Sequence, residues 1–278
     1  MSYKTVLVHV DESARASERI KIAAAIAMAE HAHLIGTAVT GASRYFLQAR
    51  LQEMDPNLRE HVHFLRERAE HGLDDFEAAA RRIEMPSFEK RLVDDEAGGG
   101  ICLQARYADL VVIGQNDPKE GSPVVLPDFP QYVVLNSGRP VLLVPYTGRF
   151  DTIGNRVLIG WDASMAASHA ITGALPLLRC AQKIHVAVIR SGKQPQAGSS
   201  PPGKEICLYL ARHGIKAEMV ERETEAPVAD ALLDLAAELH SDLMVAGAYG
   251  HSRFREIMLG DVTARILQSM CVPVLMSA

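Results

Sequence analysis

Cysteine is scarce in this sequence, with four thiols spread along 278 residues at Cys102, Cys180, Cys207 and Cys271. No two of them form a Cys-x2-Cys pair, so neither a zinc site nor a disulfide framework is indicated. Isolated cysteines are typical of small apolar residues in a reducing compartment. An excess of basic residues is lacking too, because the formal net charge is −5. That charge gives no electrostatic reason to expect nucleic acid or an anionic membrane as a partner.

Long apolar runs are also missing, although 48% of the residues are hydrophobic. No stretch reaches the length of a membrane span, and the first residues lack the basic region and cleavage site of a signal peptide. Neither Gly-x-Ser-x-Gly nor His-Glu-x2-His is present, so no sequence motif supports a hydrolase or a metalloprotease. We therefore expect a cytoplasmic protein that is not an enzyme and carries no metal centre.

The sequence contains two tandem copies of one repeat unit. Three segments recur in the same order: 4–13 in 155–164, 109–114 in 242–247, and 139–144 in 272–277. The repeat predicts a first domain over 1–147 and a second over 155–278. The connecting residues 146–154 carry turn-forming glycines and no apolar periodicity, which is typical of a linker.

Short apolar runs alternate with helical patterns within each copy. In the first copy we expect strands at 5–10, 33–39, 88–93, 110–113 and 141–144, and helices ending near 31 and spanning 58–83, 97–107 and 130–136. In the second we expect strands at 156–161, 183–189, 215–221, 243–246 and 273–276, and helices at 164–180, 203–213, 227–240 and 262–269. Continuous apolar strands with intervening helices indicate a parallel sheet covered on both faces, a doubly wound α/β fold.

The two copies differ in length. From Asp11 to Gly114 is 103 residues, whereas from Asp162 to Gly247 is 85. The first copy is therefore 18 residues longer, and we expect the extra segment in 41–58, after the second strand.

A glycine-punctuated loop follows the apolar run 242–246. Its spacing is Gly247-x2-Gly250-x9-Gly260, and it leads into a helical pattern that ends at Ser269. A strand, a loop and a helix N-terminus in this order bring free backbone N–H groups and the positive end of a helix dipole together. Such a place is a common phosphate-binding site.

This loop resembles the nucleotide-binding signature of the universal stress protein family, and the repeats extend the resemblance over nearly the whole chain. The resemblance implies two tandem Rossmann-like domains with strand order 3-2-1-4-5 and a ligand cleft between strands 1 and 4. It implies a role in the stress response and adenine-nucleotide binding, with ATP as the type ligand. The family's ATP binders have a hydroxyl residue after the last glycine, whereas this chain has Asp261.

Two further residues of the second copy match family positions. Asp162, after the first strand, stands where the family's aspartate contacts the nucleoside, although an aspartate just before Ser164 could instead cap a helix. Val188 resembles the position whose backbone pairs with the adenine edge. The loop and helix residues that the resemblance brings to the phosphates are Gly247, Gly250, His251, Ser252, Arg253, Gly260, Asp261, Val262 and Thr263.

Some of these residues also have a purely structural interpretation. His251, Ser252 and Arg253 could equally form a solvated loop surface. The hydroxyl of Thr263 could donate to a phosphate or simply sit in the helix. We expect Asp261 to cap the last helix and to repel a polyphosphate, so that ATP binds weakly without Mg²⁺. Asp261 could itself hold Mg²⁺ against the phosphates.

The corresponding loop of the first copy has lost its glycines. Asp117 and Pro127 stand against Gly250 and Gly260, and Asp128 stands against Asp261. Proline has no N–H to donate and lacks the backbone freedom of glycine. We therefore expect a degenerate phosphate cradle here and a structural role for the first domain.

Three hypotheses for the function follow. The first is a stress-response binding or sensing module with an altered adenine-nucleotide cleft in the second domain. The second is an interaction protein that binds no nucleotide, and the third, least supported, is a slow ATPase. The repeat also predicts an intrachain pseudo-dimer, with 141–144 pairing with 274–276, and allows a homodimer of chains.

Overall fold

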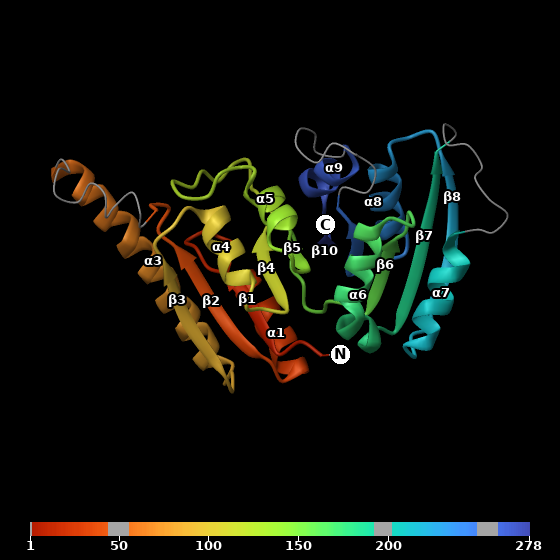
Figure 1. The fold of residues 1–278 in the computed structure, drawn as a ribbon, viewed down its shortest axis with the longest axis horizontal. Helices are drawn as coiled ribbons and strands as arrows, with labels where there is room; N and C mark the ends of the chain where they lie inside the picture. Colours follow the sequence, from red (N-terminus) through yellow and green to blue (C-terminus); the bar gives the residue numbers. More distant parts are fainter. Residues whose placement is uncertain (1, 44–55, 192–201, 249–260) are drawn as a thin grey trace. The chain divides into compact units, whose positions relative to one another are not determined.

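The computed structural model describes residues 2–43, 56–191, 202–248 and 261–278 (Figure 1). The chain divides into two compact units, Ser2–Val141 and Leu142–Ala278, so that the boundary falls within strand β5 (Val141–Val144). Each unit is described by itself below, and the predicted pairing between 141–144 and 274–276 stays a prediction. Among the described residues, no helix is long and apolar enough to cross a membrane.

The first unit is a parallel sheet with helices on both faces. In chain order its elements are β1 (Thr5–His9), α1 (Ala16–Glu30), β2 (His33–Val39), α3 (Pro56–Arg82), β3 (Phe88–Val93), α4 (Ala97–Ala105), β4 (Leu110–Gly114) and α5 (Phe129–Asn136). The strand order is β3-β2-β1-β4. In register, Val6 of β1 pairs with Leu34 on one side and Leu110 on the other. Helices α1 and α3 pack on the sheet together, and α4 packs with α5.

The core of this unit depends on one close approach between a strand and a helix. The Phe76 side chain of α3 is fully buried, and its ring lies over Gly36 of β2. A Cβ on Gly36 would stand only 2.5 Å from that ring, so glycine is needed here to seat the phenylalanine. Phe88 of β3 meets the same ring edge-on, with 6.0 Å between the ring centroids.

The second unit repeats this architecture. Its elements are β6 (Arg156–Gly160), α6 (Met165–Cys180), β7 (Lys183–Ser191), α7 (Pro202–Arg212), β8 (Glu218–Thr224), α8 (Val228–Glu238), β9 (Leu243–Gly247), α9 (Asp261–Ser269) and β10 (Val274–Ser277). The strand order β10-β9-β6-β7-β8 is parallel throughout. Counted within the repeat it reads 5-4-1-2-3. The predicted α/β class, in two tandem Rossmann-like units, is confirmed.

Two sequence predictions need correction. Strand β8 lies at 218–224, three residues later than predicted, because the apolar Ile215 does not belong to it. Ile215 is buried and donates its amide to Leu210 at the end of α7, after a left-handed turn at Gly214. The strand itself is rich in charge, as suits an exposed sheet edge, and gave little apolar signal.

The second correction concerns the extra length of the first copy. Helix α3 has 27 residues, whereas its counterpart α7 has 11. Most of the additional chain therefore lies in this helix, whose expected span of 58–83 agrees with the structure to within two residues at each end. Residues 44–55, where we placed much of the extra segment, lie outside the described part of the chain.

An aspartate holds the start of the first strand in each unit. Asp109 accepts hydrogen bonds from the amides of Lys4 (2.7 Å) and Thr5 (3.0 Å). Asp242 does the same for the second unit, with donors drawn from a longer stretch of backbone. Its carboxylate accepts from the amides of Gly154, Asn155 and Arg156 and from the Thr152 hydroxyl, at 2.9–3.2 Å.

Candidate functional site

The candidate site of the second unit lies at the carboxyl ends of β6 and β9, where the strand order reverses. Ligands bind at this point in doubly wound sheets. Asp162 follows β6 and is exposed, and its Oδ1 accepts the amide of Ser164 at 2.9 Å. The N-cap of α6 is Ser164, whose Oγ accepts the amide of Ala167 at 3.1 Å. The helix cap is therefore supplied by the serine, and the alternative role for Asp162 as the cap is not needed.

Gly247 ends β9 against the first turn of α6. A Cβ at this position would lie 2.3 Å from the amide nitrogen of Ala167 and 2.7 Å from the carbonyl carbon of Ala166. Both atoms belong to the helix backbone and cannot rotate aside. Gly247 thus has a structural use, because it lets the N-terminus of α6 come up to the end of β9.

The backbone at the end of β7 bears on the contact expected of Val188. The amide of Trp161 donates to the carbonyl of Ala187 at 2.9 Å, so Ala187 faces β6. Successive residues of a strand turn their backbone groups to opposite neighbours, so Val188 faces β8 and Ile189 faces the β6 side again. The first unit agrees, because Val39, at the position of Ile189, lines its cavity. Ile189 is therefore better placed than Val188 to offer backbone groups to a ligand.

The glycine loop is only partly within the described residues. Gly250, His251, Ser252, Arg253 and Gly260 lie outside them. Asp261 is the exposed first residue of α9, and its expected role as the cap of this helix stays a prediction. Val262 is 39% exposed, whereas Thr263 is 3% exposed on the inward face of the helix. Inward packing favours the structural interpretation of Thr263.

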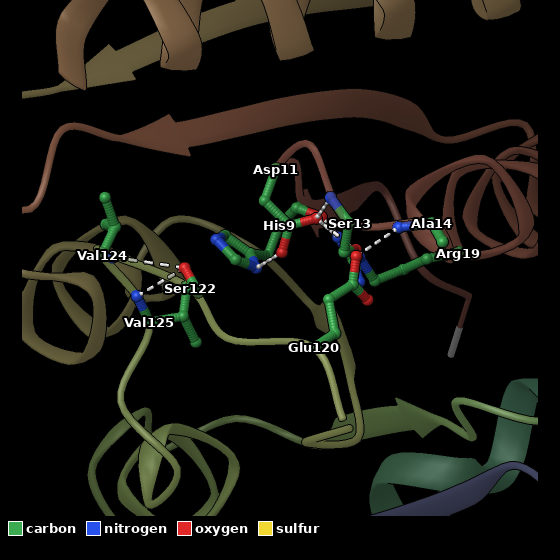
Figure 2. Close-up of polar contacts among 9 residues, drawn as sticks. All are labelled: His9, Asp11, Ser13, Ala14, Arg19, Glu120, Ser122, Val124 and Val125. Atoms are coloured by element: carbon green, nitrogen blue, oxygen red, sulfur yellow. Dashed lines mark hydrogen bonds and ion pairs between the residues drawn. The ribbon is translucent and has the colours of Figure 1, made fainter. Parts of the chain in front are cut away.

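The first unit fills the equivalent place with a side chain that the sequence analysis missed. Arg19 of α1 is 3% exposed. Its Nε donates to the carbonyl of His9 and its Nη2 to Oδ1 of Asp11, each at 2.7 Å. A Cβ on Gly114, the counterpart of Gly247, would lie 2.6 Å from Nη1 of Arg19. The switch point between β1 and β4 is therefore occupied by a guanidinium (Figure 2).

This arrangement alters the electrostatics of the cleft. Burial alone would raise the pKa of Asp11, but the charges of Arg19 and His9 and hydrogen bonds from Ser13 and Arg19 hold it well below its usual range. Burial lowers the pKa of His9 to about 4, against the opposing effect of Asp11 and with the help of Arg19. At neutral pH the cleft therefore holds a paired carboxylate and a neutral imidazole. The signal available in the sequence was an arginine among the buried apolar residues of α1.

The backbone donors of the first unit's loop are already engaged. Ser122 Oγ accepts the amides of Val124 (3.2 Å) and Val125 (3.0 Å), as Figure 2 shows. Asp117 accepts the amide of Lys119 at 2.9 Å. These contacts use N–H groups of the loop that a phosphate would need. The carboxylate of Glu120 also occupies the amide of Ala14, which follows β1, at 2.9 Å. The geometry thus argues against a phosphate cradle here.

Two doubly wound α/β units in tandem, each with an aspartate after its first strand, define the class of protein. The model of the universal stress protein family matches residues 2–145 and 155–277, and the chain belongs to this family. A curated relative, universal stress protein Slr1230 of Synechocystis, is 26% identical over 152 residues. That match covers 51% of this chain, and the chain spans about half (48%) of that relative.

Solved structures show the same fold over almost the full length. A universal stress protein from Archaeoglobus fulgidus gives a TM-score of 0.73 at 14% identity, covering 98% of this chain and 97% of the other. A protein of unknown function from Pseudomonas aeruginosa gives 0.63 at 17% identity, with 98% and 92% covered. At these identities the likeness speaks for the fold alone.

Proposed function

We propose that this universal stress protein is a stress-response binding or sensing module whose second unit binds an adenine nucleotide. The observation that carries the proposal is the position of the Gly-x2-Gly-x9-Gly spacing. It starts at the last residue of β9, beside the strand that Asp162 follows. The same motif at this strand end is the family's nucleotide signature.

The local geometry supports this assignment. Asp162 is exposed at the end of β6, and a carboxylate there can accept hydrogen bonds from ribose hydroxyls. Ile189 directs its backbone to the same edge. Gly247 admits the N-terminus of α6 to the end of β9, which brings the positive end of the helix dipole close to the cleft.

The first unit serves in this proposal as a partner domain without a nucleotide of its own. Arg19 occupies its switch point, and its loop amides are bonded within the loop. We therefore expect one equivalent of nucleotide per chain, in the second unit.

Titration calorimetry of the full chain with ATP and Mg²⁺, and with AMP, tests the proposal. We expect one equivalent per chain, weakened at least tenfold by Asp162→Asn and unchanged by Glu225→Gln, a control at an exposed acidic residue of the same unit. Two equivalents would contradict the asymmetry between the units. No binding of either nucleotide, and none co-purified in native mass spectrometry, would favour an interaction protein without a nucleotide.

A further inference from the structure

The cleft of the first unit contains a small cavity that the proposed function does not use. Its volume is about 130 Å³, and it opens at the carboxyl ends of β1, β2 and β4. Ligand pockets for drug-sized molecules occupy roughly 300–1,000 Å³. The cavity is therefore too small for a nucleotide but large enough for a short organic molecule.

One residue that lines the cavity has a buried polar atom without a partner among the described residues. His9 lines the cavity and is 1% exposed, and its Nε2 makes no hydrogen bond to any residue that the structure describes. Figure 2 shows the opposite ring nitrogen facing Asp11, with Nε2 turned away from Asp11 and Arg19. Nδ1 lies 3.6 Å from Oδ2 of Asp11. A proton on Nδ1 facing the carboxylate leaves Nε2 as an acceptor that requires a donor.

The neighbouring strand also has a buried polar atom without a hydrogen-bond partner among the described residues. Thr37 is the register partner of His9 on β2, and its buried Oγ1 also lacks a partner within the described residues. Unsatisfied acceptors of this kind cost free energy unless a ligand or water supplies a donor. Of the two residues, His9 lines the cavity and Thr37 does not, so His9 is the one that a ligand in the cavity would meet.

The mouth of the cavity carries carboxylates that no ion pair among the described residues neutralises. Asp11 is paired with Arg19, and Glu12 with Arg68. Asp117 and Glu120 also line the cavity and accept backbone amides, but neither has a cationic partner in the described part of the chain. These two carboxylates favour a cationic ligand over an anionic one.

Between these acceptors the wall is aliphatic. It is formed by side chains of β2, α3 and the loop after β4, among them Val39, Leu65, Ala69, Val124 and Val125. Methylene groups can be buried against such a surface, whereas a hydrated inorganic cation gains nothing from it. The combination suits a molecule that is apolar in its middle and cationic at its ends.

From this combination we infer that the first unit binds a short aliphatic diamine in the cavity between His9 and the Asp117–Glu120 turn. One ammonium group lies among the acidic residues at the mouth. The hydrocarbon chain packs against the aliphatic wall, and the inner amine donates to Nε2 of His9. The second unit lacks this site, because Gly160 stands at the position of His9 and Ala170 at that of Arg19.

Calorimetry at pH 7.5 with 1,4-diaminobutane tests the inference on the full chain. We expect one saturable equivalent per chain and weaker binding of 1-aminobutane. The double variant Asp117→Asn/Glu120→Gln should weaken the diamine by about fivefold or more. The matched control Glu223→Gln/Glu225→Gln removes the same charge from exposed residues of the second unit and should leave the affinity unchanged.

A second variant tests the inner end of the site. His9→Phe keeps an aromatic ring against Phe129, whose ring centroid lies 4.9 Å away, and removes the acceptor without changing the charge at pH 7.5. It should abolish binding of the diamine. If it does not fold, as judged by circular dichroism, the Asp117→Asn/Glu120→Gln variant at the exposed mouth still decides.

Three results would overturn the inference. They are no saturable binding to the wild-type chain, equal weakening in the mouth variant and its charge-matched control, and full affinity in a folded His9→Phe protein. Equal affinity for the monoamine and the diamine would also contradict a site that holds both ends. None of these results depends on nucleotide binding by the second unit, so the two proposals stand or fall separately.

Discussion

Nη2 of Arg19 lies 2.7 Å from Oδ1 of Asp11, and the side chains of this pair are 3% and 26% exposed. The pair joins α1 to the end of β1 and excludes other groups from the switch point of the first unit. Removing one partner of a buried ion pair leaves the other charge uncompensated, and this is costly. The consequences can be measured in the stability of the first unit.

We expect Arg19→Met to destabilise the first unit by about 3 kcal/mol in urea unfolding of the full chain. Adding Asp11→Leu should restore part of the loss, because both charges are then gone. The control is Arg68→Met, which breaks the more exposed pair with Glu12 and should cost less than about 1 kcal/mol. Similar losses in the two single variants would show that the Arg19 pair contributes no more than a surface contact.

His9 should make the stability of the first unit depend on pH. The unfolded chain protonates this residue near pH 6.5, whereas burial lowers the pKa in the folded state to about 4. Between these values the unfolded state binds more protons, so the free energy of unfolding falls as the pH falls. From pH 7.5 to pH 5 the expected loss is about 2 kcal/mol.

The variant His9→Gln should remove this slope, which urea unfolding at the two pH values can check. Asp11 acts at lower pH with the same sign, because its pKa is depressed in the folded state. Its contribution is present above the ordinary carboxylate pKa and is lost as the pH falls below it. An unchanged slope between pH 7.5 and 5 in His9→Gln would show that His9 is not its source.

Gly247→Ala should be poorly tolerated. The added methyl would meet the backbone of Ala166 and Ala167, and relieving such overpacking typically costs about 1–3 kcal/mol. We also expect lost nucleotide binding, because α6 must withdraw from the end of β9. Gly121→Ala is the control, since a Cβ there meets nothing within 4 Å. A Gly247→Ala protein with wild-type stability would contradict the packing role of this glycine.

Asp261 should limit the affinity for ATP. A like charge about 5 Å from a phosphate oxygen costs roughly 3 kcal/mol at an effective dielectric of 20, which exceeds the gain of about 0.3–1 kcal/mol from an anion at an exposed helix N-terminus. Asp261→Ser should therefore tighten ATP binding in EDTA and reduce the dependence on Mg²⁺. Asp128→Ser, in the first unit, is the control and should change nothing. Tight binding of ATP to the wild type in EDTA, with no gain in the serine variant, would refute the argument.

The fold could be predicted because its signals are local and repeated. Strand 33–39 matches the structure at both ends, since an apolar run bounded by polar turns marks a buried parallel strand. Strand 88–93 also matches at both ends, although it is a charged strand at the edge of the sheet. Strand β8 was misplaced because its charged residues suit a sheet edge and carry little periodicity. The helix expected at 58–83 agrees with α3 to within two residues at each end. The extra residues of the first copy were assigned to the segment before it, because a gap in an alignment does not reveal which element absorbs it.

The candidate sites were harder to predict from sequence, and for a different reason. Motif spacing locates Gly247 and Asp162, because their roles follow from their place at strand ends. The Arg19–Asp11 pair depends on which face of α1 meets the sheet, and the choice between Val188 and Ile189 depends on which neighbour each backbone group faces. Neither relationship can be read from residue types alone.

The hydrogen bonds of the Asp242 carboxylate also limit where the chain can be divided between the two repeats. Its four donors begin at Thr152, ahead of β6, and the first two lie within the stretch that the sequence assigns to the linker. A fragment that starts at Asn155 would leave half of this carboxylate's contacts behind. A fragment that contains the second repeat alone should therefore start before Thr152. A protease site inserted between the two repeats should also be placed before this residue.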